Sequence, residues 1–170
     1  MFGIEGNISK HYFQTLRRTL PEKFQFDKRS RRPSLDMFNA ALNYLYGCTY
    51  SVIHQGILAA KLDPYVGLLH VNGLNKSSLT YDLIEPIRPL IDRLLLQLID
   101  EQKLDASHFK NNAKAVWIHK KGKKVILTAF HNYLYQKIEI NKQILPVKTH
   151  CYLLAQNLKK EIDIYVSNHV

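Results

Sequence analysis

Cysteine, methionine and tryptophan are all rare in this sequence of 170 residues. The two cysteines, Cys48 and Cys151, both lie among apolar residues, and they do not form a CxxC pair. This usage argues against a disulfide framework and is typical of free thiols in a reducing compartment. We therefore expect two buried, unpaired thiols in a cytoplasmic protein.

Long apolar runs and several common catalytic motifs are also missing. No window approaches the ~20 apolar residues of a membrane-spanning helix, and the opening MFGIEGNISKHYF lacks the basic and apolar regions of a signal peptide, so we expect no membrane association. The histidines show no HExxH or HxxxH spacing, which excludes a zinc protease of that type. The absence of GxxxxGK[ST], GxGxxG and GxSxG argues against a glycine-cradled nucleotide and against a serine hydrolase.

Acidic residues are scarce relative to basic ones. The chain has 14 Asp and Glu against 24 Lys and Arg, which gives a formal charge of +10. Such an excess favours an anionic polymer or surface as partner, and nucleic acid is the leading candidate. A ribosomal or membrane-surface protein could be equally basic, so charge alone leaves these alternatives open. Hydrophobic residues make up 46% of the chain, a globular balance, and the length favours a single domain.

The first 33 residues predict a helix followed by a basic loop. Apolar residues recur at helical spacing from Glu5 to about Arg18, and Pro21 ends the pattern. Residues 21–33, PEKFQFDKRSRRP, then combine two prolines with five basic residues and little periodicity. This loop is predicted to be either a solvated connection or a segment that contacts phosphates.

A long core helix is predicted next. Ser34 or Asp36 can cap its start, and it is expected to run to about Leu62, because Pro64 disfavours helical backbone at the residue before it. Its predicted buried stripe consists of Leu35, Phe38, Leu42, Leu45, Thr49, Val52, Ile53 and Ile57.

The helix predicted from about Ser78 contains two prolines. Its periodicity places Leu79, Leu83, Ile87, Leu90, Leu94 and Leu98 on the buried face, and Asp82, Glu85 and Asp92 elsewhere. Pro86 cannot donate a hydrogen bond to the carbonyl of Asp82, nor can Pro89 donate to that of Glu85. We therefore expect the helix to bend or restart beside these two acids.

The remainder is predicted to be mostly helical. Residues 115–118 and 124–127 are predicted to form a small hairpin around the basic turn HKKGKK. Helices are expected over about 125–140 and 146–166, with a proline in the first turn of the second. The predicted fold class is mostly α, as a single helical domain with this one hairpin.

The stretch from residue 62 to residue 92 carries the candidate chemistry. Asp82 and Glu85 are spaced to share one helix face, and the loop before them could fold His70 back toward them. Two carboxylates and an imidazole suit a divalent ion used for phosphoryl transfer, and a third carboxylate would complete the set. Taken alone, His70 is more often a structural histidine, and the two acids also fit an ordinary solvated pair.

Four sequence blocks across the first 92 residues resemble a known family. IEGNISKHYF, RRPSLDMFNAALNYLYG, LDPYVGLLH and SLTYDLIEPIRPLID occur in this order. Together they resemble the catalytic helical domain of the CRISPR spacer-acquisition integrase, the first numbered CRISPR-associated protein. Members of that family usually carry a β-rich domain before the helical one, so the resemblance implies either a natural short form or a fragment of a longer chain.

The resemblance implies a metal site and its ligands. The EG block aligns the family's metal-binding glutamate with Glu5, and the LH block aligns its histidine with His70. The DLxE block aligns the remaining acids with Asp82 and Glu85. We expect Mg or Mn to be bound by Glu5, His70 and Glu85, with Asp82 as a catalytic residue in close support.

The resemblance also implies residues that contact DNA or support the site. The matching positions are Arg31, Arg32, Asp36, Asn39, Tyr44 and Arg88. For nucleic-acid binding we expect Arg31, Arg32 and Arg88, and Lys120 and Lys121 of the basic HKKGKK segment.

The predicted function is a metal-dependent DNA integrase and endonuclease, assigned to residues 1–170 as one catalytic domain. It would insert spacer DNA into a CRISPR array through attack of a DNA 3′-hydroxyl on a phosphodiester. Expected partners are double-stranded DNA with 3′-hydroxyl ends, CRISPR array DNA, further copies of the chain and the second numbered CRISPR-associated protein. The alternative is a basic helical module that binds DNA without cutting or joining it.

Overall fold

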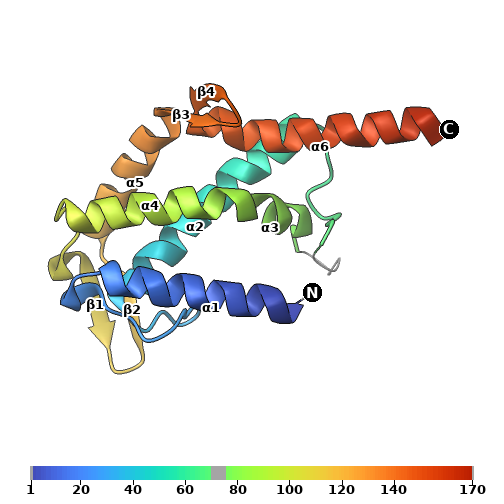
Figure 1. Cartoon of the computed structure of the whole chain (residues 1–170). Helices are drawn as coiled ribbons and strands as arrows, with labels where there is room; N and C mark the ends of the chain where they lie inside the picture. Colours follow the sequence, from blue (N-terminus) through green and yellow to red (C-terminus); the bar gives the residue numbers. More distant parts are fainter. Residues whose placement is uncertain (1, 70–75, 170) are drawn as a thin grey trace. The chain divides into compact units, whose positions relative to one another are not determined.

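The computed structural model describes residues 2–69 and 76–169, without the side chains of residues 2–5. The fold is mostly helical, as predicted (Figure 1). Its α-helices are α1 (Phe2–Thr19), α2 (Met37–Ala59), α3 (Ser78–Ile84), α4 (Arg88–Asp100), α5 (Lys120–Tyr135) and α6 (Val147–His169). Short 3₁₀ turns are η1 (Glu22–Phe24), η2 (Glu85–Ile87) and η3 (Ala106–His108). The strands β1 (Phe109–Asn112) with β2 (Ala115–Ile118), and β3 (Lys137–Ile140) with β4 (Gln143–Pro146), form two antiparallel hairpins.

Two units make up the chain, and each is assembled from two separate stretches. Unit 1 comprises Met1–Tyr44 and Arg93–Ala129, and unit 2 comprises Leu45–Asp92 and Phe130–Val170. The helices α2, α4 and α5 therefore contribute residues to both units.

In unit 1, the predicted first helix, the basic loop and the start of the second helix are all confirmed. Phe26 of the loop stacks on Phe38 of α2 with ring centroids 4.6 Å apart, and both rings are buried. The Asp36 carboxylate accepts a hydrogen bond from the backbone N–H of Asn39 at 2.7 Å, which satisfies one of the free N–H groups at the start of α2. Leu35, predicted to be buried, is 54% exposed because it precedes this cap and lies outside the helix.

The predicted hairpin between residues 115–118 and 124–127 is wrong in its partner strand. Residues 115–118 do form a strand, but it pairs with the preceding β1, Phe109 opposite Ile118 and Asn112 opposite Ala115. The Asn112 side chain accepts hydrogen bonds from the backbone N–H groups of Lys114 and Ala115, both at 2.9 Å. This Asx turn reverses the chain between β1 and β2, before the HKKGKK segment is reached. The HKKGKK segment forms no turn of a hairpin and instead leads into α5.

In unit 2, the rest of α2 provides the centre of the core. Leu45, Ile53 and Ile57 are each no more than 1% exposed, as the helical stripe predicted. Gly56 of this helix lies so close to α6 that a Cβ there would approach the backbone of Tyr152 to 3.3 Å. A small residue at this position therefore allows α2 and α6 to pack closely.

The predicted break beside the two prolines is confirmed. The helix changes from α3 to the 3₁₀ turn η2 and then to α4. Because the prolines cannot donate, the carbonyl of Asp82 accepts instead from the N–H of Glu85, and the carbonyl of Glu85 accepts from the N–H of Arg88.

The predicted buried face of this segment is correct only in part. Asp82 and Asp92, expected away from the core, are 8% and 2% exposed. Each carboxylate is buried because other parts of unit 2 supply donors: backbone N–H groups for Asp82 and the hydroxyl of Tyr46 for Asp92, at 2.6 Å. Leu83 and Leu90 are only half-buried, while Ile84 and Ile91 are completely buried.

A second hairpin replaces the end of one predicted helix. The helix expected over 125–140 starts earlier, at Lys120, and ends at Tyr135. Residues 137–140 then form β3, which pairs with β4 across a turn where Asn141 and Lys142 have φ of 52° and 64°. Two positive φ angles are the signature of a tight hairpin turn, and asparagine tolerates this conformation better than most residues.

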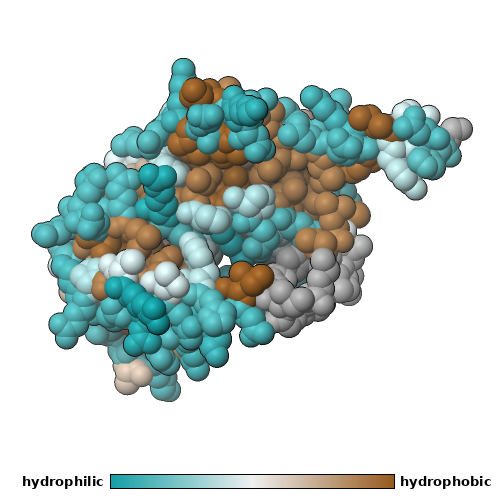
Figure 2. Space-filling model, viewed as in Figure 1, coloured by the Kyte–Doolittle hydropathy of each residue, from teal (hydrophilic) through white to brown (hydrophobic). Residues whose placement is uncertain are grey.

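The helix α6 confirms the last predicted helix and is exposed along its C-terminal part. Ile162, Ile164, Tyr165 and Val166 are between 39% and 65% exposed. Figure 2 shows that hydrophilic side chains cover most of this end of the helix, with single hydrophobic residues between them. No helix among the described residues is both long and apolar enough to span a bilayer.

We predict that Gly122→Ala destabilises the protein by about 1–3 kcal/mol, because overpacking a tight contact forces the backbone to shift. A Cβ at this position would meet the carbonyl oxygen of His108 at 2.6 Å and Cγ2 of Ile118 at 2.8 Å. The matched control is Gly47→Ala, where a Cβ meets nothing within 4 Å and helix propensity should add about 0.5–1 kcal/mol of stability. Urea denaturation measures both, and equal effects of the two substitutions would contradict the prediction.

We further predict that the two free thiols differ in reactivity. Burial raises the pKa of Cys151 to about 12, so almost no thiolate exists in the folded protein at pH 8. Burial also raises the pKa of Cys48, but this residue is only partly buried. Iodoacetamide at pH 8 should therefore label Cys48 first, and Cys151 only after unfolding in guanidinium. Mass spectrometry of the labelled peptides checks this order, which equal labelling rates in the folded protein would refute.

Candidate active site and nucleic-acid interface

Asp82 holds the backbone that leads to residue 70. It lies on α3, and its Oδ2 accepts hydrogen bonds from the backbone N–H of Leu68 at 2.6 Å and of Leu69 at 3.1 Å. Four residues earlier along the same stretch, the carbonyl of Pro64 accepts from the N–H of Leu79 at 3.0 Å. The stretch from residue 64 to residue 69 is therefore fixed to α3 at two points.

Glu85 differs from Asp82 in exposure and in its partner. Its side chain is 37% exposed, and its Oε1 lies 2.9 Å from Nη1 of Arg88. Charge-assisted pairs of this length restrict both side chains, so Arg88 holds the Glu85 carboxylate in a defined position. The two acids that the sequence placed together thus have different surroundings: one is buried against backbone donors, and the other is partly open to solvent.

Arg88 is itself held by tyrosines of α2. Its Nη2 donates to the hydroxyl of Tyr50 at 3.2 Å, and its guanidinium carbon lies 5.3 Å from the centre of the Tyr46 ring. Burial alone would lower the pKa of Arg88, but the combined interactions with Tyr50, Glu85 and Tyr46 outweigh it and raise the pKa. The Nε atom of Arg88 is buried and has no hydrogen-bond partner within the described part of the chain. Arg88, which we expected to support the site or contact DNA, therefore supports Glu85 here.

The other two predicted metal ligands cannot be placed in the same detail. Glu5 belongs to the first turns of α1, but its side chain is not described, and His70 lies outside the described residues. Among the residues that are described, no three His, Cys, Asp or Glu side chains gather as a metal site would require. The ligand set of Glu5, His70 and Glu85 stays a prediction.

The predicted nucleic-acid-binding residues of unit 1 are exposed. Arg31 and Arg32 lie in the basic loop, and Lys120 and Lys121 form the first turn of α5. Lys123 follows on the same helix, with its ammonium 5.7 Å from the centre of the Tyr44 ring. The first turn of α5 has no acidic residue, so the positive end of the helix dipole and its lysines both favour anions.

An arginine that we did not single out organises the basic loop. Arg29 donates to Oδ1 of Asn39 and, at 2.9 Å, to Oδ1 of Asn43. Asn39 also donates to the carbonyl of Lys28 and to the Asp36 carboxylate. Asp36 and Asn39, expected to be structural or DNA-contacting supports, are thus structural. The signal in the sequence was the pair of asparagines four residues apart in the otherwise apolar first turns of this helix.

The tyrosines that hold Arg88 were also missed. Tyr46 and Tyr50 lie four residues apart on α2. Periodicity could place them on one face of the helix but could not reveal that Arg88, 38 residues after Tyr50, would join them.

Two solved structures share this fold. A casposase bound to its integration product superimposes with a TM-score of 0.86 and 27% sequence identity, over 93% of this chain and 46% of that one. A CAS1 protein from Thermotoga maritima superimposes with a TM-score of 0.85, over 93% of this chain and 50% of that one. Its sequence identity of 24% supports the fold alone. The chain therefore has the helical fold found in casposases and CAS1 proteins.

Sequence comparison identifies the family. The family model for the CRISPR associated protein Cas1 matches residues 1–132. A CRISPR-associated endonuclease Cas1 of Moorella thermoacetica is 32% identical over 96% of this chain and 51% of its own length. The Methanocaldococcus jannaschii protein of the same name is 30% identical over 93% of this chain and 51% of its own length. The chain belongs to the Cas1 family, and it spans about half the length of the curated relatives it matches.

We predict that Asp82→Ala loosens the stretch before residue 70. Removing the carboxylate leaves the N–H groups of Leu68 and Leu69 without their acceptor, and hydrogen bonds to a charged group are worth about 1.5–3 kcal/mol. Amide hydrogen exchange at these two residues should accelerate, with a loss of global stability of similar size. Asp63→Ala is the control, because this exposed carboxylate accepts only from the N–H of Tyr65 within the described residues and should change stability by less than about 0.5 kcal/mol. Unchanged exchange at Leu68 and Leu69 would show that Asp82 does not anchor them.

Proposed function

We propose that this chain is the catalytic part of a metal-dependent DNA integrase and endonuclease that inserts spacer DNA into a CRISPR array. The observation that carries the proposal is the family match over residues 1–132, which include Glu5, His70, Asp82 and Glu85. The names of the relatives agree with it: the Moorella protein is called a CRISPR-associated endonuclease, and the casposase structure holds an integration product. We also assign residues 1–170 to one catalytic domain.

We propose that Glu5, His70 and Glu85 bind Mg or Mn. Carboxylate oxygens are the ligands these hard cations prefer, and an imidazole can complete the set. The described member, Glu85, fits this role, because its carboxylate is partly exposed and Arg88 restrains it. When bound, the ion would polarise the phosphodiester and stabilise the charge that develops on it. Asp82 would contribute by holding the stretch that leads to His70.

The proposed reaction exchanges one phosphodiester for another. The oxygen of an incoming DNA 3′-hydroxyl attacks a phosphorus atom of the target strand, and the bond from that phosphorus to the target 3′ oxygen breaks. The proton lost by the attacking hydroxyl is balanced by one gained at the released 3′ oxygen, so no external energy source is needed. Water in place of the DNA hydroxyl gives the endonuclease reaction by an equivalent in-line attack.

The basic residues of unit 1 are proposed to hold the DNA. Arg31, Arg32, Lys120 and Lys121 are all exposed, and the N–H groups at the start of α5 add to the attraction for phosphate. Binding should therefore weaken steeply as the salt concentration rises.

We propose that the complete activity involves partners. The expected ones are double-stranded DNA with 3′-hydroxyl ends, the CRISPR array, further copies of this chain and Cas2. A Cas6-RT-Cas1–Cas2 complex supports the last, because its Cas1-containing chain matches this one with a TM-score of 0.84 at 26% identity, over 96% of this chain and 18% of that one.

We predict that the protein joins a 3′-hydroxyl DNA duplex to a supercoiled plasmid in Mg or Mn at low salt. His70→Ala and Glu85→Gln should each reduce joining about 100-fold, because losing even a residue that supports a metal ligand costs about 10–100-fold. Both variants should retain most of the DNA affinity of the parent. Gel analysis of joined and nicked plasmid, with and without EDTA and with and without Cas2, measures the activity.

The matched control is Glu101→Gln, which removes the same charge from an exposed carboxylate that pairs with Lys103. It should join DNA at the rate of the parent. If the parent binds DNA but neither joins nor nicks it under any of these conditions, the chain is the non-catalytic DNA-binding module that we considered as the alternative.

A further inference from the structure

A tyrosine of α2 and two residues of α4 form a buried cluster in unit 2. Tyr46 is 8% exposed and Asp92 is 2% exposed. The hydroxyl of Tyr46 donates to Oδ1 of Asp92 at 2.6 Å, and the guanidinium carbon of Arg88 lies 5.3 Å from the centre of the Tyr46 ring. Arg88 and Asp92 are four residues apart on α4, so one turn of this helix holds the tyrosine both at its hydroxyl and over its ring.

The other contacts of Arg88 show why this tyrosine matters. Its Nη1 lies 2.9 Å from Oε1 of Glu85 and its Nη2 donates to Tyr50, whereas its buried Nε has no hydrogen-bond partner within the described residues. A buried donor without an acceptor disfavours this position of the guanidinium. The attraction between the Tyr46 ring and the guanidinium opposes that cost, and such an attraction is stronger in a desolvated place than at the surface.

The carboxylate of Asp92 acts on the same ring. A hydroxyl that donates to a carboxylate at 2.6 Å forms a charge-assisted hydrogen bond, which is shorter and stronger than one between neutral groups. Hydrogen bonds inside a protein polarise their members, so the phenol oxygen and its ring become richer in electrons. A more negative ring face attracts a guanidinium more strongly. Asp92 therefore fixes the orientation of Tyr46 and also strengthens its contact with Arg88.

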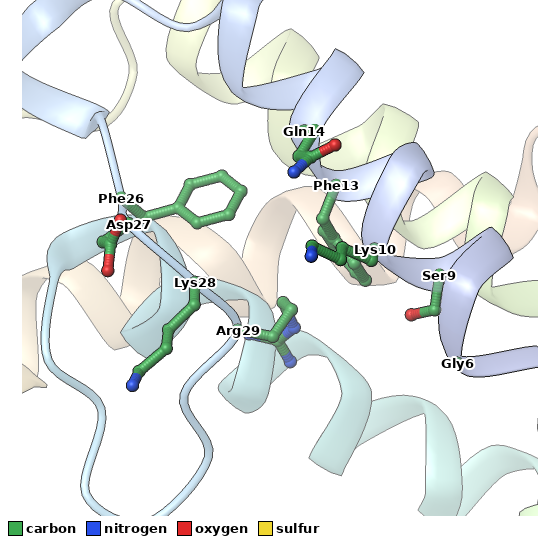
Figure 3. A pocket seen from close by; sticks show the side chains of 9 residues that line it. All are labelled: Gly6, Ser9, Lys10, Phe13, Gln14, Phe26, Asp27, Lys28 and Arg29. Carbon is green, nitrogen blue, oxygen red and sulfur yellow. The ribbon is translucent and has the colours of Figure 1, made fainter. Parts of the chain in front are cut away.

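Another arginine lies near an aromatic ring and lacks this arrangement. The guanidinium carbon of Arg29 is 5.2 Å from the centre of the Phe13 ring. Figure 3 shows the Phe13 side chain on α1 and the Arg29 side chain on the loop of residues 26–29. Phenylalanine has no hydroxyl for a carboxylate to bind, and Arg29 is fixed instead by its bonds to two asparagines of α2. A buried carboxylate behind the ring thus distinguishes Arg88, the arginine that restrains the proposed metal ligand Glu85.

We propose that Tyr46 and Asp92 are positioning residues for the metal-binding carboxylate. Asp92 holds Tyr46, whose ring holds Arg88. Arg88 in turn restrains the Glu85 carboxylate. Removing a residue that supports a metal ligand in this way typically lowers metal affinity 10–100-fold. This role rests on the proposed function for the identity of Glu85 as a ligand, and it adds which buried groups set the place of its carboxylate.

The Mn²⁺ affinity of the whole chain in the absence of DNA tests this role, with free Mn²⁺ measured by electron paramagnetic resonance. Asp92→Asn removes the charge but keeps an oxygen that can accept from Tyr46, and Tyr46→Phe keeps the ring but removes its donor. Each variant should bind Mn²⁺ about tenfold more weakly. Asp100→Asn removes the same charge from an exposed position of α4 and should change the affinity less than about twofold.

A double variant shows whether Tyr46 acts through Arg88. Arg88→Gln alone should weaken Mn²⁺ binding at least about tenfold, and the addition of Tyr46→Phe should have no further effect. Additive losses would show that the two residues act independently and would overturn the proposal. Ile53→Val is the stability control, because it removes a methyl group from a buried residue of α2 outside the cluster. It should lower stability to urea without changing Mn²⁺ affinity.

Glu85→Gln separates the positioning role from the proposed function. If Mn²⁺ binding by the parent requires Glu85, but Tyr46→Phe and Asp92→Asn lose stability alone, the pair is structural and only the present proposal is overturned. If the parent binds no Mn²⁺, or Glu85→Gln binds it as the parent does, the proposed ligand set fails together with the positioning role. Tyr46→Phe and its combination with Arg88→Gln decide the outcome even if Asp92→Asn does not fold.

Discussion

A carboxylate that leaves water must find hydrogen-bond donors inside the protein, and in this chain the donors come from distant parts of the sequence. Asp82 accepts from the backbone just before residue 70, and Asp92 accepts from Tyr46 on α2. Leaving either carboxylate without these donors would cost more than the contacts themselves contribute. Each pairing therefore restricts which segments can lie side by side within unit 2.

The two prolines explain how neighbouring acids come to have different surroundings. Pro86 and Pro89 replace regular helix with a 3₁₀ turn between α3 and α4. Asp82, before this turn, is buried against the backbone, whereas Glu85, at the start of it, is partly exposed and restrained by Arg88. One carboxylate thus anchors backbone, while the other is partly exposed beside Arg88. This division fits the roles that we propose for them.

Local features could be predicted well from the sequence, and features that depend on distant partners could not. The cap at Asp36 and the break at the two prolines follow from backbone chemistry within a few residues. The second helix ends at Ala59, slightly before the expected Leu62, because the backbone turns at Lys61 with φ of 58°. The β1–β2 hairpin was assigned to the wrong partner, because residues 115–118 have the character of a strand whichever neighbour they pair with. The side chain of Asn112 decides the partner, and its two hydrogen bonds appear only in the folded turn.

The same limit applies to the candidate site: its local spacing could be predicted, but its distant contacts could not. The spacing of Asp82 and Glu85 suggested a pair acting together, but spacing could not tell which one would be buried. Burial depends on Leu68 and Leu69, whose N–H groups reach Asp82 only after the intervening loop has turned back. The arginine at position 88 was identified from the resemblance, whereas its contacts with two tyrosines of α2 required the three-dimensional structure.

The interleaved composition of the two units has a consequence for how the protein is made. Residues 45–92 of unit 2 leave the ribosome well before residues 130–170, and unit 1 is likewise completed only when residues 93–129 follow residues 1–44. Neither unit can finish folding as a contiguous piece during synthesis, since at about 5–20 residues per second the missing half arrives seconds later. A chain that stopped after residue 129 would therefore leave residues 45–92 without the stretch that completes unit 2, rather than a smaller folded unit.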